Sequence, residues 1–349
     1  MNRSATMRRT TVIAALTAAV VLALAGCASG DTEPESAATK PAGPLKDVTL
    51  TLNFLAGGPN SGFMVALDKG YYEEEGLNVK IQEGQGSNST ASLVDAGNSE
   101  FGFADGPSAM AVTSQGGDLV NIGPILQTNG FSVMSLKESG IEEIADLEGK
   151  SVALQPGTAQ ASLFDAVLAA NGVDPSTVNI VNIDPSALVA SLLQGSVDAI
   201  TAGADSQGVQ LREQGAEINE IMYRDADVPT VGLSMITTNA YAAANPDIVK
   251  AFVKASLRGW DEARNNPEEA ADIVVEQFPQ GAIASSIVAQ LDVDTKLLCS
   301  AGSPGLGALS AENWDATYDL LVKYLDLPTT LPITDYYTED YLPQELPAC

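Results

Sequence analysis

Residues 48–81 read VTLTLNFLAGGPNSGFMVALDKGYYEEEGLNVKI, and this stretch decides the fold. Val48–Phe54 alternates apolar and polar side chains, which is typical of a β-strand. After a break at Gly57–Asn60, apolar side chains at helical spacing predict one helix over residues 61–75. Leu77–Ile81 alternates again. The stretch therefore predicts a strand, a helix and a second strand.

The same alternation of strand and helix signals continues along most of the chain. Further strands are predicted at 101–104, 119–126, 151–154, 178–183, 197–202 and 231–237, and further helices at 87–97, from Pro107, at 158–171, 186–194, from Ser206, and at 246–265, 267–278 and 310–325. This order predicts an α/β protein with two lobes, closed by C-terminal helices. In such folds ligands bind at the carboxyl ends of the parallel strands, here facing a cleft between the lobes.

The composition excludes several classes of function. The 349 residues include 45 acidic and 17 basic side chains, and a net charge of -28 argues against nucleic-acid binding. The chain contains no histidine, which excludes Ser-His and Cys-His catalysis and histidine-ligated zinc. Three cysteines are too few for a cysteine-only zinc site. The acidic run Glu73–Glu75 is typical of a solvated helix end. We therefore expect neither a metal nor a cofactor.

The N-terminal residues predict export and membrane attachment. Met1–Arg9 carries three arginines and no acid, and Val12–Ala25 is fourteen uncharged, mostly apolar residues. As a helix this run would span about 21 Å, less than the roughly 30 Å of a hydrocarbon core. Residues 1–26 are therefore predicted to be a signal peptide. Leu24–Cys27 resembles the lipobox of bacterial lipoproteins, in which the cysteine is lipidated and becomes the mature N-terminus. An ordinary signal peptide with a chance cysteine is the alternative.

The segment after the lipobox predicts a disordered tether over residues 27–44, because Ala28–Pro44 contains no large apolar side chain. Removing residues 1–26 takes away three arginines and no acid, so the net charge becomes -31 instead of -28. No other stretch reaches about eighteen apolar residues. We expect an extracytoplasmic protein held at the outer face of the cell membrane by its lipid anchor alone.

The remaining cysteines, Cys299 and Cys349, form an even pair outside the reducing cytosol. A disulfide that holds the C-terminal tail is the preferred interpretation, and two separate thiols are the alternative. Closing this loop of about 50 residues would stabilise the fold by roughly 4 kcal/mol.

Four segments resemble a known family. They are GFMVALDKGYYEEEGLNV (62–79), EFGFAD (100–105), DLEGKSVALQPG (146–157) and LQGSVDAI (193–200). In this order they resemble the solute-binding proteins of ABC importers, in the branch that takes alkanesulfonates, taurine, nitrate and thiamine-pyrimidine precursors. The resemblance covers residues 48–280. It implies a type II periplasmic-binding-protein fold: α/β, with two mixed, mostly parallel sheets, a ligand cleft and two hinge crossings.

The resemblance also implies domain boundaries and a mode of action. Lobe one comprises residues 45–130 and 233–349, lobe two comprises 131–232, and the crossings lie near 127–132 and 229–234. A small solute enters the cleft and shifts an open–closed equilibrium towards the closed form. The closed form then docks on a membrane permease. We therefore expect a monomeric transport protein and no enzyme.

Candidate solute contacts lie where strands run into helices, because backbone N–H groups are unpaired there. They are Asn53, Phe54, Ser87, Asn88, Ser89, Thr90, Asp105, Gly106 and Ser108 from lobe one, Gln127 and Asn129 near the first crossing, and Gly157, Thr158, Gln160 and Asp205 from lobe two. Phe54 is a stacking face or ordinary core. Ser87–Thr90 contacts solute, caps a helix, or does both. Asp205 holds a cationic or amine-bearing solute or only caps a helix.

The negative charge of the protein ranks the candidate solutes. A strongly acidic body slows an approaching anion, and no Lys or Arg is among the candidates. A neutral or cationic heterocycle, such as a thiamine pyrimidine precursor, therefore ranks above an alkanesulfonate, taurine or nitrate. Members of the branch often have Trp where this chain has Asn53-Phe54, and an aromatic-Glu-Pro-like stretch where this chain has Gly203–Ser206. The ligand is therefore not transferred from relatives. Fungal pyrimidine-forming relatives imply an active-site histidine that this chain lacks. An adhesin or scaffold is the remaining alternative.

Overall fold

Two five-stranded sheets make up the fold of the computed structural model, which describes residues 43–299 and 303–349. The predicted signal peptide, Cys27 and all but the end of the predicted tether lie outside the described residues. The first sheet has the order β2 (Leu77–Gln82), β1 (Lys46–Thr51), β3 (Phe101–Asp105), β10 (Leu233–Thr238) and β4 (Leu119–Pro124). The second has the order β7 (Asn179–Asn182), β6 (Ser151–Leu154), β8 (Ala199–Gly203), β5 (Phe131–Leu136) and β9 (Ile218–Met222).

Each sheet has one strand that runs against the other four. β10 pairs antiparallel with β3 and β4, and β5 pairs antiparallel with β8 and β9. β1 pairs parallel with β2 and β3, and β6 pairs parallel with β7 and β8. β5 and β10 are the strands that the chain enters on passing from one sheet to the other. The predicted α/β fold with two mixed, mostly parallel sheets is confirmed.

The chain passes between the sheets twice, at residues 125–130 and again between β9 and β10. The two passing segments lie side by side: the Asn129 amide donates to the Thr230 carbonyl at 3.0 Å, and the Gly232 amide donates to the Leu126 carbonyl at 3.2 Å. All strands of the first sheet fall within the predicted lobe one and all strands of the second within lobe two, so we keep these names for the two parts.

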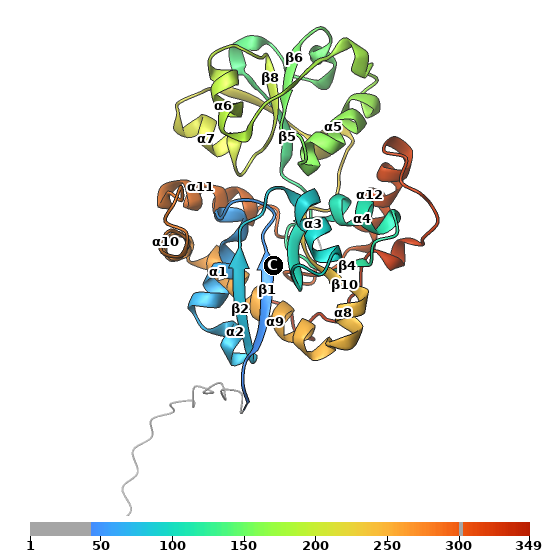
Figure 1. Cartoon of the computed structure of the whole chain (residues 1–349). Helices are drawn as coiled ribbons and strands as arrows, with labels where there is room; N and C mark the ends of the chain where they lie inside the picture. The colour runs from blue at the N-terminus through green and yellow to red at the C-terminus, as the bar shows by residue number, and fades with distance from the viewer. Residues whose placement is uncertain (1–42, 300–302) are drawn as a thin grey trace, which may run out of the picture. The chain divides into compact units, whose positions relative to one another are not determined.

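Helices surround each sheet (Figure 1). Those of lobe one are α1 (Ser61–Asp68), α2 (Tyr71–Glu74), α3 (Ser87–Asp95), α4 (Gly106–Ser114), α8 (Asn239–Ala244), α9 (Pro246–Asn265), α10 (Pro267–Gln277), α11 (Ala284–Thr295) and α12 (Ala311–Tyr324). Those of lobe two are α5 (Ala159–Ala170), α6 (Pro185–Leu193) and α7 (Gln207–Glu213). Short 3-10 helices are η1 (Gly58–Asn60), η2 (Lys137–Ser139), η3 (Ile144–Leu147), η4 (Pro175–Thr177), η5 (Tyr223–Ala226) and η6 (Ile333–Asp335).

The prediction of one helix over residues 61–75 is wrong. The structure has two helices there, α1 and α2, separated at Lys69-Gly70. Gly70 has φ 74°, in the left-handed region that favours glycine and ends a helix. The break turns the chain so that Tyr72 of α2 is fully buried in the core of lobe one.

α12 contacts both lobes. Its Trp314 and Leu321 share a hydrophobic cluster with Leu163 of α5. The Thr317 hydroxyl accepts a hydrogen bond of 2.9 Å from the Val231 amide, in the second passing segment. The Asn313 side chain donates to the Gln127 carbonyl, in the first one, at 3.5 Å. The sequence assigned this helix to lobe one and offered no signal for its second role.

The predicted disulfide between Cys299 and Cys349 is present, with 5.9 Å between the two Cα atoms. It closes a loop that contains α12 and holds the C-terminus near the end of α11. Over residues 43–299 and 303–349, no helix combines the length and the hydropathy that a membrane span needs.

Candidate functional site between the lobes

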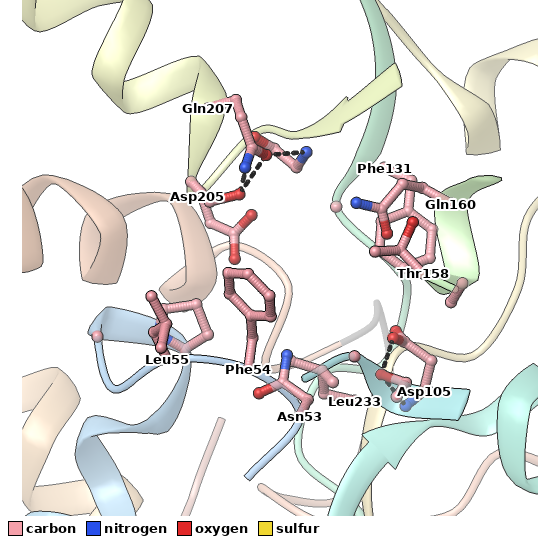
Figure 2. Close-up of a pocket in the computed structure, with 18 of the residues that line it drawn as sticks. Asn53, Phe54, Leu55, Asp105, Phe131, Thr158, Gln160, Asp205, Gln207 and Leu233 are labelled. Atoms are coloured by element: carbon pink, nitrogen blue, oxygen red, sulfur yellow. Dashed lines mark hydrogen bonds between the residues drawn. The ribbon is translucent and has the colours of Figure 1, made fainter. Parts of the chain in front are cut away.

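A pocket of about 240 Å³ lies between the two lobes and is lined by side chains of both (Figure 2). The predicted contact residues that line it are Asn53, Phe54, Ser87, Asp105, Asn129, Thr158, Gln160 and Asp205. These residues lie at the ends of strands that the sheet topology brings together. Asn53 and Asp105 follow or end the parallel strands β1 and β3, and Thr158 and Asp205 follow the parallel strands β6 and β8. The pocket therefore lies at the carboxyl ends of both sheets.

The other predicted residues lie outside this pocket. Asn88 and Ser108 line a second pocket beside α12, and Ser89 is exposed on α3. The Thr90 hydroxyl donates to the Leu52 carbonyl, and the Gln127 side chain donates to the Ala308 carbonyl. These two side chains are buried and their hydrogen bonds hold the fold.

The two predicted glycines also have structural positions. The Gly106 amide donates to the Gly232 carbonyl at 3.1 Å, which joins the start of α4 to the second passing segment. Gly157 has φ 84° and lies between Gln155 and Thr158, which line the pocket. A Cβ added to Gly86 of lobe one would lie 2.9 Å from the Gly157 carbonyl oxygen of lobe two. The two glycines thus mark a place where the lobes touch.

Asp105 forms the acidic group of the lobe one wall. It is the last residue of β3, and its carboxylate accepts a hydrogen bond of 2.6 Å from the Ser87 hydroxyl. The same hydroxyl accepts from the Asp105 amide at 3.2 Å, so the two residues hold each other. Burial raises the pKa of Asp105 to about 7, against the lowering effect of the Ser87 hydrogen bond, and the charge of Asp205 raises it further.

Asp205 forms the acidic group of the lobe two wall. It lies in the turn between β8 and α7, where the Gln207 side chain accepts from the Gly203 amide and the Ser206 hydroxyl. Loss of solvent around its carboxyl raises the pKa of Asp205 to about 6, and nearby backbone amides oppose this rise. Asp105 and Asp205 are the charged residues among those that line the pocket, and no Lys or Arg is among the described lining residues.

Two aromatic rings enter the pocket from opposite walls. The Phe54 side chain projects into it and points towards Asp205 (Figure 2). Phe54 is half-buried and lies outside the hydrophobic clusters found in the described part of the chain, so the core alternative does not apply to it. Phe131, at the start of β5, packs edge-on against Tyr223 with 6.2 Å between ring centroids. Phe54 therefore offers the freer stacking face.

Amide side chains complete the lining. Asn60 donates to the Asn53 side-chain oxygen at 2.7 Å, and the Gln290 side chain accepts from the Gly58 amide at 2.8 Å. Sequence reasoning missed several lining residues: Leu55, Asn60, Gly86, Phe131, Gln155, Gln207 and Gln290. Phe131 lies within the predicted crossing 127–132 and Gln155 directly follows the predicted strand 151–154, so both could have been found there. Gln290 could not, because it reaches the pocket only through the packing of α11 on η1.

The lobes touch on two sides of the pocket. On one side, Gly86 lies against Gly157, and the Asn88 side chain donates to the Ser162 hydroxyl at 3.4 Å. On the other side, the Ser286 hydroxyl of α11 donates to the Glu213 carboxylate of α7 at 2.8 Å. The residues that the structure describes contain no cluster of three or more Cys, Asp or Glu side chains that could hold a metal ion.

Comparisons with curated proteins match this chain over much of its length. The riboflavin-binding protein RibY of Chloroflexus aurantiacus is 24% identical over 93% of this chain and 95% of its own length. The formylaminopyrimidine-binding protein of Halalkalibacterium halodurans is 24% identical over 73% and 76%. The 4-amino-5-hydroxymethyl-2-methylpyrimidine phosphate synthase of Legionella pneumophila is 25% identical over 67% and 74%.

Solved structures share the fold. The periplasmic aliphatic sulphonate binding protein SsuA from Escherichia coli matches with a TM-score of 0.68 and 18% identity, over 86% of this chain and 94% of that one. The periplasmic nitrate-binding protein NrtA from Synechocystis matches with a TM-score of 0.63 and 14% identity, over 85% and 87%. The chain thus has the periplasmic-binding-protein fold. The sequence profile of the family described as "NMT1/THI5 like" matches residues 60–270, more than half of the chain, and the protein belongs to that family.

Proposed function

We propose that this protein is the solute-binding component of an ABC importer and that it captures a small heteroaromatic solute, such as a thiamine pyrimidine precursor. The observation that carries the proposal is the pocket between the lobes. Phe54 and Phe131 offer aromatic faces to a flat ring. Asp105 and Asp205 accept hydrogen bonds from ring N–H or exocyclic amino groups. A ring with amino substituents satisfies both features at once.

The size of the pocket supports a single-ring solute. Its volume of about 240 Å³ lies below the roughly 300–1,000 Å³ of pockets that hold drug-sized ligands. Riboflavin has three fused rings and a ribityl chain, and it needs more room than an aminopyrimidine. The relative that is named for riboflavin therefore does not decide the ligand of this chain.

The charge of the pocket supports the same ranking. Asp105 and Asp205 line it without a Lys or Arg among the described lining residues. An alkanesulfonate, taurine or nitrate would bring a negative charge next to these carboxyls, and only the N-termini of helices such as α3 and α5 could offset it. A neutral or cationic solute loses less free energy when it enters the pocket. Transport of such an anion remains the second candidate because solved structures of sulphonate- and nitrate-binding proteins share the fold.

Capture works through closure of the lobes. The contacts at Gly86–Gly157 and Ser286–Glu213 support a closed arrangement in which both lobes contact the solute. The solute shifts the equilibrium only if it binds the closed form better than the open one. We further propose that Cys27 carries lipid, that the monomer stays at the outer face of the membrane, and that the closed form docks on a membrane permease.

We propose binding without chemistry. One relative is named as a synthase, so an enzyme is the competing function. The chain has no histidine to act as a general acid or base near neutral pH. If purified protein converted 4-amino-5-hydroxymethyl-2-methylpyrimidine or formed it from any added precursor, as followed by mass spectrometry, the enzyme would replace the binding protein.

A thermal-shift panel tests the ligand. The purified protein is unfolded with 4-amino-5-hydroxymethyl-2-methylpyrimidine, formylaminopyrimidine, riboflavin, taurine and nitrate. A ligand at 100 times its Kd adds about 2.7 kcal/mol to the free energy of unfolding. We expect a rise in Tm of several degrees with a pyrimidine and none with the two anions.

Mass spectrometry of solute released from gently purified protein is the second measurement. In the thermal-shift panel, a rise in Tm with taurine or nitrate and none with a pyrimidine would assign the protein to anion transport. No shift with any compound and no released solute would remove the solute-binding proposal altogether.

A further inference from the structure

Gln207 is a buried amide of the lobe two wall, and the binding mode proposed above gives it no role. It is the first residue of α7, lines the pocket and has only 9% of its surface exposed. Its side-chain oxygen accepts from the Gly203 amide at 3.1 Å and from the Ser206 hydroxyl at 2.8 Å. Two donors of the turn between β8 and α7 thus hold one end of this side chain.

These two bonds fix which end of the Gln207 amide faces the turn. A backbone N–H group can only donate, so the Gly203 amide requires an acceptor, and the oxygen is the acceptor of an amide side chain. The NH2 group of Gln207 must therefore point away from Gly203. Within residues 43–299 and 303–349 this NH2 group has no hydrogen-bond partner. A donor that is mostly removed from water needs a partner, and a solute in the pocket can supply it.

Asp205 lies at the same corner of the pocket. A Cβ added to Gly203 would lie 2.5 Å from an oxygen of the Asp205 carboxyl and 2.6 Å from the Ser206 hydroxyl oxygen. The same hydroxyl donates to Gln207, so the Asp205 and Gln207 side chains enter the pocket from one turn (Figure 2). An ionised carboxyl only accepts hydrogen bonds. The turn therefore presents an acceptor and a free donor close to each other.

This pair matches one edge of an aminated aromatic ring. Where an amino group stands next to an unprotonated ring nitrogen, the amino group donates and the ring nitrogen accepts. Proteins that read adenine in DNA pair an Asn or Gln side chain with an amino group and a ring nitrogen in an analogous way. Nitrate offers only acceptors, so it cannot satisfy the carboxyl and the amide together.

We propose that Gln207 is a specificity-determining residue of the solute site: with Asp205 it reads the edge of an aromatic ring on which an amino group stands next to an unprotonated ring nitrogen. The Gln207 NH2 group donates to the ring nitrogen, and the Asp205 carboxylate accepts from the amino group. The proposal rests on the proposed function, because it names the part of the solute that the same pocket recognises. A ring with C–H in place of this nitrogen leaves the NH2 group unpaired and binds less tightly.

A double-mutant cycle between protein and solute tests the pairing. The two probes are 4-amino-5-hydroxymethyl-2-methylpyrimidine and 4-amino-5-hydroxymethyl-2-methylpyridine, in which C–H replaces the ring nitrogen beside the amino group. The variant is Gln207→Met, which keeps the length of the side chain and removes the donor. Calorimetry gives the four affinities at pH 8, where Asp205 is ionised although burial raises its pKa to about 6.

The cycle should show a loss that belongs to the ring nitrogen. We expect Gln207→Met to weaken binding of the pyrimidine roughly tenfold and binding of the pyridine by less than about threefold. The pyridine takes up a proton at its remaining nitrogen, but this charge cancels because each ratio compares two proteins with the same probe. An equal loss for both probes, or no loss for the pyrimidine, would overturn the proposal.

A second variant keeps the contacts of the turn. Gln207→Glu retains an oxygen that accepts from Gly203 and Ser206 but replaces the NH2 group by a second acceptor. It should weaken binding of the pyrimidine at least about tenfold, and wild-type affinity would overturn the proposal. This variant decides the question if Gln207→Met does not fold.

Gln214→Met is the matched control, because Gln214 is exposed at the end of the same helix. It should bind both probes with wild-type affinity. A loss in Gln214→Met equal to that in Gln207→Met would show an effect of the helix as a whole and would overturn the proposal.

Binding by the wild-type protein separates this proposal from the proposed function. If the wild-type protein binds neither probe, the pyrimidine ligand is wrong, and the solute released from gently purified protein decides the reading of the edge. A released solute with an amino group next to an aromatic ring nitrogen would support the pairing. Any other solute, or none, would overturn it.

Discussion

The two walls of the pocket hold their carboxyls in different ways. Asp105 of lobe one is bonded within its own lobe, where the Ser87 hydroxyl donates to its carboxylate and accepts from its amide. Asp205 of lobe two lies in the turn between β8 and α7, where nearby backbone amides lower the pKa that burial raises. The Ser87 bond lies within lobe one and does not depend on closure, whereas the charge of Asp205 reaches Asp105 from the other lobe.

This difference indicates a division of labour. A wall that is preorganised can bind solute first at little reorganisation cost. The turn of lobe two adds a second carboxyl after closure, and its charge raises the pKa of Asp105, so closure is sensitive to pH.

Removal of the Phe54 ring should have the largest effect. Phe54→Ala takes away the freer stacking face of the lobe one wall, and we expect solute affinity to fall by about 2–3 kcal/mol, or roughly 30- to 150-fold. The unfolding free energy without solute should change little, because Phe54 is half-buried and outside the core clusters. Calorimetry on Phe54→Ala and on Phe54→Leu, which keeps apolar volume without a ring, separates stacking from filling. Equal affinity of the wild-type protein, Phe54→Ala and Phe54→Leu for the solute would exclude Phe54 from the site.

Neutralising the two carboxyls should give unequal losses. Asp105→Asn removes a fixed acceptor and should weaken an aminopyrimidine by about 2 kcal/mol, or roughly 30-fold. Asp205→Asn should cost less, because Asp205 lies in a turn, whereas the Ser87 hydroxyl fixes the position of the Asp105 carboxyl. Affinities of both variants at pH 6 and pH 8 measure this difference. A larger loss in Asp205→Asn would reverse the order of the two walls.

Breaking the hold on Asp105 should lower stability. Ser87→Ala leaves a buried carboxylate without its hydroxyl donor, and the free energy of unfolding should fall by about 1–2 kcal/mol. The matched control is Ser89→Ala on the same helix, where the exposed side chain should matter by less than about 0.5 kcal/mol. Urea unfolding of both variants checks this, and equal stabilities would show that the Ser87 bond contributes nothing.

A methyl group on the rim should have the smallest effect. Gly86→Ala places a Cβ near the Gly157 carbonyl and should weaken solute by about 1 kcal/mol, or roughly fivefold, because the lobes cannot approach as closely. Gly116→Ala is the matched control: its φ of 99° carries similar strain, but a Cβ there meets no atom within 4 Å. Calorimetry should find wild-type affinity in Gly116→Ala. The same affinity in both variants would exclude the rim from closure.

The sequence predicted the part of the site that depends on strand ends. Asn53, Asp105 and Asp205 follow from periodicity and topology, because parallel strands bring their carboxyl ends together. The same reasoning also selected Thr90 and Gln127, whose side chains lie outside the pocket and bond to backbone groups that local patterns do not reveal. A polar side chain near a strand end can face the solvent-filled cleft or bond to a backbone group. Which of the two it does depends on the packing around it.

The remaining features arise from contacts between distant parts of the chain. Gln290 reaches the pocket because α11 packs against η1, and Ser286 reaches Glu213 because α11 packs against α7. α12 reaches lobe two because its apolar face matches α5. Neither contact has a period or motif within the chain, so the amphipathic pattern of a helix predicts that a face is buried without naming the partner. The break at Gly70 was readable, since glycine near a helix end favours positive φ.

The positions of the two tryptophans have a practical consequence. Trp260 is fully buried among Phe63 and Phe103 in the core of lobe one, where closure leaves its surroundings intact. Trp314 of α12 stacks on Tyr337 and shares a cluster with residues of lobe two. Any change in intrinsic fluorescence on closure should therefore originate from Trp314 and persist in Trp260→Phe. The chain contains its own optical reporter of lobe movement, at a distance from the solute and without an added label.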